Sequence, residues 1–290
     1  MSSFDAARID PPASTIEPAL EREYNLRPRH PERQAVYADF ARRSELTRDR
    51  LPALLDQRYG SGPRAVLDVF PAGPGAPLFI FIHGGYWRTL DKSIFSCLAE
   101  SFVAAGICVV MPNYDLAPGV PLRTIVGQMR AVLGWLGENA AGFGGDAGRF
   151  VLSGHSAGGH LAAMAALDCH ARADAALRGL VPVSGLFDLR PLLRTSVNHD
   201  IRLPPEEAAA LSPVLRAGRL GVPPVPLLLL AGGAETDGFK LQSETFLSAW
   251  RDEGGSGEFI LAPGCTHFTV LDAMAAPDGE VLATVTRALG

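Results

Sequence analysis

The chain has 290 residues, of which 47% are hydrophobic and 20% are charged, and its formal net charge is −5. These values are typical of a globular domain with a large core, and without a basic block they argue against nucleic acid as a partner. The longest apolar run, residues 225–231, is too short to cross a bilayer, and the N-terminus shows no signal-peptide pattern. We therefore expect a cytoplasmic protein with no membrane partner.

The four cysteines are scattered along the chain without paired spacing: Cys97, Cys108, Cys169 and Cys265. This distribution predicts neither a disulfide framework nor a zinc site, and it fits a reducing compartment. We expect no metal.

The first part of the chain predicts a short tail followed by one domain. Residues 1–20 are rich in proline, alanine and serine and are expected to be poorly ordered, whereas residues 21–290 are expected to form a single α/β domain. Residues 30–58 have a helical pattern, with three predicted buried side chains: Val36, Phe40 and Leu46.

From residue 64 onward, short apolar runs alternate with longer amphipathic ones. The predicted strands are 64–70, 77–82, 107–111, 149–153, 180–184, 225–231 and 258–262. The predicted helices are 91–105, 121–137, 157–171, 238–252 and 278–289. This alternation predicts a mostly parallel sheet with helices on both faces and an active site beyond the carboxyl ends of the strands. Residues 186–220 fit no strand and are expected to form a small cap.

A nucleophile motif lies between the predicted strand 149–153 and the predicted helix that follows it. Residues 154–158 spell Gly-His-Ser-Ala-Gly, which places Ser156 between two glycines at a strand-to-helix turn. Glycine relieves crowding in so sharp a turn, and the start of the helix places partial positive charge beside a developing oxyanion. The pattern alone is weakly specific, but its position predicts that Ser156 is a catalytic nucleophile.

A second motif follows the predicted strand 77–82, where His83-Gly84-Gly85-Tyr86-Trp87 begins the next loop. The N–H groups of Gly84 and Gly85, with that of Ala157, are predicted to form an oxyanion hole. His83 is expected to shape this loop by hydrogen bonding. Tyr86 and Trp87 are predicted to line the substrate pocket, and core packing behind the loop is an equal alternative for Trp87.

The base should be a histidine that follows both the nucleophile and the acid along the chain. His267 satisfies this order and comes just after the last predicted strand, 258–262. His199, in the expected cap, is the weaker alternative.

The acid should follow the predicted strand 225–231, where Glu235 and Asp237 both qualify. Asp237 stands where it could cap the next helix, which favours Glu235 as the acid that orients the histidine. Asp188, after the preceding strand, is a third candidate and is interpreted as structural.

These motifs together resemble the α/β-hydrolase superfamily, in the branch near the hormone-sensitive-lipase-like esterases. The loop that begins at His83 is similar to the H-G-G-x-W loop of kynurenine formamidases (arylformamidases), rather than to the three-glycine loop of the esterases. In that family an acid stands four residues before a phenylalanine, and Glu235 has this position although the family often has Asp. Further similar segments, covering most of the chain after residue 20, are 24–27, 113–118, 154–161 and 235–243.

The resemblance and the motifs predict a serine hydrolase that cleaves a small N-formyl aryl amide, such as N-formylkynurenine, or a short-acyl aryl ester. No cofactor is implied, and the expected partner is a small-molecule substrate, with a homodimer left open. The alternatives are a general short-chain carboxylesterase and, less favoured, a non-catalytic ligand-binding protein on a hydrolase scaffold. The last alternative is disfavoured because no triad member is missing from the sequence.

Overall fold

The computed structural model describes residues 16–290. Most of the tail predicted at residues 1–20 therefore lies outside the described residues. Its last part differs from the prediction, because helix α1 (Pro18–Tyr24) already begins at Pro18, with proline at the first helical position where no N–H is needed.

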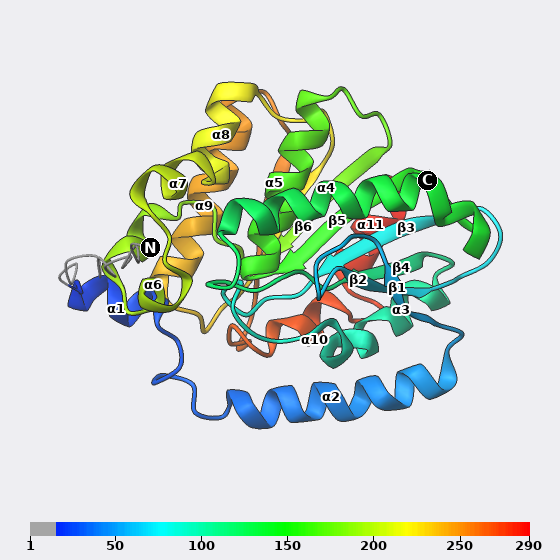
Figure 1. Ribbon diagram of the computed structural model, residues 1–290, viewed down its shortest axis with the longest axis horizontal. Coiled ribbons are helices and arrows are strands. Elements are labelled where there is room, and N and C mark those ends of the chain that lie inside the picture. The colour runs from blue at the N-terminus through cyan, green and yellow to red at the C-terminus, as the bar shows by residue number, and fades with distance from the viewer. Residues whose placement is uncertain (1–15) are drawn as a thin grey trace, which may run out of the picture.

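Eight strands of the described chain form one twisted sheet in the order β1-β2-β4-β3-β5-β6-β7-β8 (Figure 1). Strand β2 is antiparallel to both β1 and β4, whereas the remaining neighbours are parallel. The strands are β1 (Leu54–Arg58), β2 (Val66–Phe70), β3 (Ala76–Ile82), β4 (Cys108–Pro112), β5 (Gly145–His155), β6 (Leu177–Val183), β7 (Leu227–Gly232) and β8 (Gly257–Ala262). The predicted mostly parallel sheet is confirmed.

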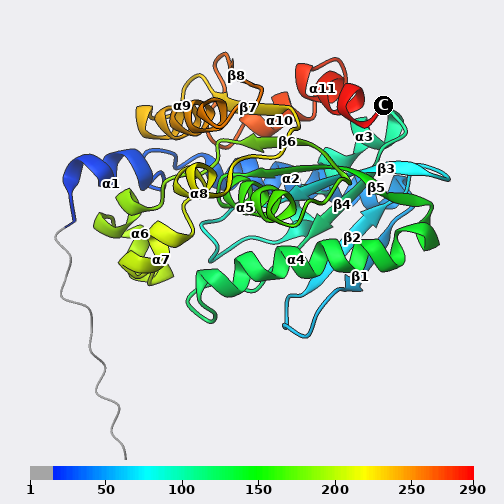
Figure 2. The ribbon, with the colours of Figure 1, turned by 90° about the horizontal axis from the view of Figure 1, so that it is seen from above.

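Both faces of the sheet are covered by helices, because alternate residues of the central strands point to opposite cores. Along β3, Leu78, Ile80 and Ile82 belong to one buried cluster, and Phe79 and Phe81 belong to the other. Figure 1 shows α4 and α5 on one side of the strands and α2, α3 and α10 on the other, and Figure 2 shows the same layers from above. The longer helices are α2 (Arg33–Arg50), α4 (Leu122–Asn139), α5 (Ala157–Ala171), α9 (Asp237–Asp252) and α11 (Glu280–Leu289).

The shorter helices fill the connections. They are η1 (Lys92–Leu98), α3 (Ala99–Ala104), η2 (Ala140–Phe143), η3 (Arg190–Arg194), α6 (Val197–Ile201), α7 (Pro205–Ala210), α8 (Pro213–Leu220) and α10 (Val270–Met274). The segment predicted as one helix over 91–105 is thus a 3₁₀ turn followed by a short α-helix. Residues 186–220 contain only helices and loops, as expected.

The predicted helical segment 30–58 is partly wrong. Helix α2 ends at Arg50, because Pro52 follows and pushes Leu51 into an extended conformation with ψ of 140°. Residues 54–58 instead form β1, which pairs with β2 at the edge of the sheet. Of the predicted buried side chains, Phe40 is fully buried, Val36 packs against the core at half burial, and Leu46 is 48% exposed.

Candidate active site

The loop between β5 and α5 holds Ser156 in a strained conformation. Ser156 has φ of 55° and ψ of −117°, a combination that L-residues rarely adopt. A Cβ at Gly158 would collide with the backbone oxygen of Ile82, and a Cβ at Gly154 would collide with the backbone of Gly158. The two glycines are therefore required by backbone packing, and the turn between them places Ser156 beyond the carboxyl end of β5.

His267 and Glu235 form a buried pair below this turn. His267 Nδ1 lies 2.8 Å from Glu235 Oε2, so Nδ1–H donates to the carboxylate and Nε2 remains available as the proton acceptor. The other carboxylate oxygen of Glu235 accepts from Ser184 Oγ at 2.5 Å and from the Gly232 N–H at 2.6 Å. Burial alone would raise the pKa of the Glu235 carboxyl, but His267 and these hydrogen bonds lower it below its usual value.

The structure separates the other acid and base candidates from Ser156. The side chain of Asp237 is 93% exposed and pairs with Lys240 at 2.9 Å. Asp237 is the first residue of α9, whose N-cap is Thr236, so the predicted capping place is shifted by one residue. Asp188 pairs with Arg190, and His199 lines a neighbouring cavity rather than the one at Ser156.

The Gly-Gly loop packs directly against the nucleophile turn. A Cβ at Gly84 would lie 2.9 Å from the backbone oxygen of His155 and 3.2 Å from the Cβ of Ser156. Gly85 has φ of +110°, which favours glycine. This close approach brings the backbone of the loop beside Ser156, where N–H groups can meet an oxyanion.

His83 shapes this loop, as predicted. It is buried, with Nδ1 2.7 Å from the Gly84 oxygen and Nε2 3.0 Å from Asn113 Oδ1, and its ring stacks on Tyr114. The Tyr114 hydroxyl donates to the His83 oxygen at 2.8 Å. Burial lowers the pKa of His83 to about 4, which makes it an unsuitable base at neutral pH.

Of the two aromatic residues in the loop, only Tyr86 reaches the pocket. Its hydroxyl donates to the backbone oxygen of Tyr24 at 2.6 Å. Trp87 is fully buried against His160, with ring centroids 5.0 Å apart. The structure therefore agrees with the core-packing alternative for Trp87.

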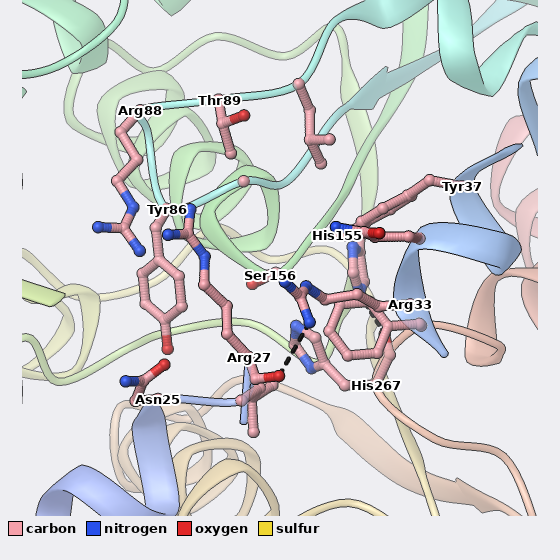
Figure 3. A pocket seen from close by; sticks show the side chains of 15 residues that line it. Asn25, Arg27, Arg33, Tyr37, Tyr86, Arg88, Thr89, His155, Ser156 and His267 are labelled. Atoms are coloured by element: carbon pink, nitrogen blue, oxygen red, sulfur yellow. Dashed lines mark hydrogen bonds between the residues drawn. The ribbon is translucent and has the colours of Figure 1, made fainter. Parts of the chain in front are cut away.

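A cavity of about 380 Å³ opens above Ser156 and His267 (Figure 3). Its far wall comes from the N-terminal segment that joins α1 to α2, a contribution that sequence analysis missed. That wall consists of Asn25, Leu26, Arg27, Arg33, Gln34 and Tyr37. None of residues 186–220 lines this cavity, so the N-terminal segment, and not the expected cap, covers the nucleophile.

His155 is a second residue that sequence analysis did not single out, because any residue can occupy that place in the motif. Its Nε2–H donates to the backbone oxygen of His267 at 2.8 Å, and it also lines the cavity. Burial and the neighbouring His267 lower the pKa of His155 to about 3, so it stays neutral. His155 thus holds the loop that carries His267.

The described part of the chain contains no cluster of three or more His, Cys, Asp or Glu side chains arranged to hold a metal ion. No helix among residues 16–290 is both long and apolar enough to span a membrane.

A strained serine after β5 and a buried His–Glu pair after β7 and β8, at the carboxyl edge of the sheet, define a hydrolase of the serine type. The family model described as alpha/beta hydrolase fold matches residues 79–271, and the chain belongs to this family. The chain is 31% identical to kynurenine formamidase from Danio rerio over 238 residues, which is 80% of each chain.

Two further relatives show the breadth of the family. A crystal structure of a proposed thioesterase from Silicibacter sp. tm1040 superposes with a TM-score of 0.78 at 35% identity, covering 87% of this chain and 93% of the other. Esterase LipQ from Mycobacterium tuberculosis is 31% identical over 150 residues, which is 46% of this chain and 35% of the esterase.

Proposed function

We propose that this hydrolase cleaves small N-formyl aryl amides of the N-formylkynurenine kind, or short-acyl aryl esters, through an acyl-enzyme. The observation that supports this most is the buried His267–Glu235 pair at the base of the cavity that Ser156 lines. The similarity to kynurenine formamidase supports the choice of substrate.

In the first half of the reaction, Ser156 Oγ attacks the acyl carbon while His267 Nε2 takes the hydroxyl proton. Glu235 stabilises the imidazolium that forms. The carbonyl electron pair moves onto the oxygen, which the N–H groups of Gly84, Gly85 and Ala157 bind. The bond to the leaving group breaks, and His267 gives its proton to the departing amine or alcohol.

In the second half, water attacks the acyl-enzyme with His267 again as the base, and collapse of the adduct returns the proton to Ser156 and releases formate or a short carboxylate. A formyl group needs almost no acyl pocket. The cavity of about 380 Å³ suits a small substrate whose bulk lies in the leaving group.

The deciding experiment measures formate release from N-formylkynurenine together with kcat/KM on aryl esters from acetyl to octanoyl. We expect formate release and a decline with acyl length, since each excess group that clashes in a rigid pocket costs roughly 1–3 kcal/mol. Rates that rise toward octanoyl, without formate release, would replace this proposal with the carboxylesterase alternative, which the similarity to esterase LipQ supports.

The ligand-binding alternative predicts no covalent chemistry at Ser156. Incubation with an organophosphonate followed by peptide mass spectrometry separates the two, because an active nucleophile is labelled at Ser156 and an inert scaffold is not. We expect labelling at Ser156 alone.

The cellular compartment, the oligomeric state and the position of the cap remain predictions. A cytoplasmic site of action is supported by four cysteines that are all free thiols, and cell fractionation tests it. The homodimer is tested by measuring mass in solution. For residues 186–220 we propose a flanking position beside the N-terminal cover, tested by whether their deletion leaves Ser156 reactive.

A further inference from the structure

The cavity above Ser156 is lined by three arginines and by no aspartate or glutamate. Arg27 and Arg33 belong to the N-terminal wall, and Arg88 follows the Gly-Gly loop. Figure 3 shows the side chains of Arg27 and Arg33 extending into the space where Ser156 and His267 lie. A pocket of this charge attracts an anion.

Arg33 is fixed in place without an acid. Its Nη1 donates to the backbone oxygens of Arg27 at 2.8 Å and His30 at 3.0 Å. These two bonds orient the guanidinium at the start of α2, and they leave its Nη2 and Nε donors for a ligand. A planar fork held in this way is suited to bind a carboxylate through two parallel hydrogen bonds.

Within the described residues, an acidic side chain pairs with only one of these three arginines. Arg88 forms an ion pair with Asp200, whereas neither Arg27 nor Arg33 has an ion-pair partner among residues 16–290. Burial, and then the nearby positive charge of Arg27, lower the pKa of Arg88. An anion bound between these guanidinium groups would relieve the repulsion.

The positive surface continues beyond the first cavity. A second cavity of about 330 Å³ shares Arg27, Arg88 and Thr89 with the first and is also lined by Arg202. Asp200 is the single acid among the residues that line either cavity, and Arg88 already occupies it. The residues that line the two cavities therefore carry a net positive charge.

We propose that Arg27 and Arg33, backed by Arg88, form a subsite that binds a carboxylate on the leaving-group side of the scissile bond. The inference rests on the proposed function, because it takes Ser156 as the nucleophile. A formyl or short acyl group has no carboxylate of its own, so the carboxylate belongs to the aryl leaving group, as it does in N-formylkynurenine.

Two acetyl esters of one skeleton test this subsite: 3-(4-acetoxyphenyl)propanoate and its neutral propanamide. The substituents are insulated from the phenol, so the leaving groups are nearly equal. We expect kcat/KM for the anion to exceed that for the neutral amide by about tenfold or more, which corresponds to ~1.4 kcal/mol.

Two variants and a matched control locate the effect. Arg27→Gln and Arg33→Gln should each reduce the anion-to-amide ratio by about tenfold, mainly through KM. Arg29→Gln removes an exposed arginine of the same segment that lines neither cavity, and it should leave the ratio unchanged.

An anion no faster than the amide, or a ratio unmoved in Arg27→Gln, would overturn the subsite. Formate release from N-formyl substrates is measured separately. Its failure with the ester preference intact would reject the formamidase function and leave the subsite standing, whereas formate release without any charge preference would reject the subsite alone.

Discussion

The nucleophile turn and the N-terminal cover lie on opposite sides of one cavity and are built in different ways. Ser156 is 3% exposed, and backbone contacts forbid any side chain at Gly154 and Gly158. The cover over 25–37 is largely exposed, and the residue just before it, Tyr24, accepts a hydrogen bond from the Tyr86 hydroxyl. Short-range backbone geometry thus fixes the chemistry, and long-range docking supplies the surface that meets the substrate.

This contrast predicts that changes in the two regions affect different kinetic constants. Changes in the nucleophile turn and the His–Glu pair should lower kcat, because those groups act on the transition state. Changes in the cover should mainly raise KM, because its groups bind substrate and transition state alike. Single substitutions on each side of the cavity test this division.

The largest expected effect follows from Ser156→Ala. Because triad members act as a unit, we expect kcat to fall by at least about 10³-fold, with no covalent intermediate. Pre-steady-state kinetics with a chromogenic ester measures this as loss of both burst and turnover. An unchanged circular dichroism spectrum is the control, and full activity in the variant would reject Ser156 as the nucleophile.

The second effect separates the two acids that sequence reasoning had to rank. Glu235→Gln should lower kcat by about 10²–10⁴-fold, because the amide no longer stabilises the His267 imidazolium. Asp237→Asn is the matched control, since it removes an exposed ion pair with Lys240 that solvent screens. A large loss in Asp237→Asn with normal turnover in Glu235→Gln would exchange their roles.

The same division explains how far the sequence could be interpreted. Ser156, Glu235 and His267 follow β5, β7 and β8, and parallel strands bring their carboxyl ends to one edge. Local pattern and strand order were therefore enough to predict that they meet. Local signals also located the main strands and helices, although the stop at Pro52 and the short edge strand after it were overlooked.

The cover could not be predicted in this way. Arg27 and Arg33 are distant from Ser156 in sequence, and what brings them to it is the docking of α1, where Glu23 accepts from Thr236 Oγ1 at 2.9 Å and from the Gly238 N–H at 2.6 Å. Such contacts have no periodicity. Only the resemblance of residues 24–27 to related enzymes gave a signal, and it carried no position in space.

The third effect concerns stability. Burial lowers the pKa values of His83 and His160 to about 4 and that of His155 to about 3. The ordinary pKa of histidine is about 6.5, so below that pH the unfolded chain binds protons that the native state does not bind. The free energy of unfolding therefore falls as the pH decreases from about 6.5 toward 4. Above about 6.5 the three histidines contribute no pH dependence.

Below about pH 6.5, each buried histidine should lower the free energy of unfolding by about 1.4 kcal/mol per pH unit. At pH 5.5 the three together should therefore lower it by about 4 kcal/mol. Urea unfolding at pH 7.5 and 5.5 measures the difference. His160→Gln, which keeps a donor for the Leu211 oxygen, should reduce that difference by about one third. Equal stability at the two pH values would show that these side chains are accessible to protons in the native state.

The smallest effect tests the hydrogen bond that joins the Gly-Gly loop to the N-terminal segment. Tyr86→Phe removes the hydroxyl that donates to the Tyr24 oxygen at 2.6 Å, a bond worth about 0.5–1.5 kcal/mol. If the cover only binds substrate, KM should rise up to about tenfold while kcat changes less than about threefold.

Tyr59→Phe is the matched control. It removes a buried hydroxyl that donates to the backbone oxygen of Asn113 at a distance of 2.7 Å, and neither residue lines the cavity. It should cost comparable stability without changing KM. A drop in kcat in Tyr86→Phe alone would mean that the cover also holds the Gly-Gly loop in its catalytic position, and the separation of chemistry from binding would fail at this residue.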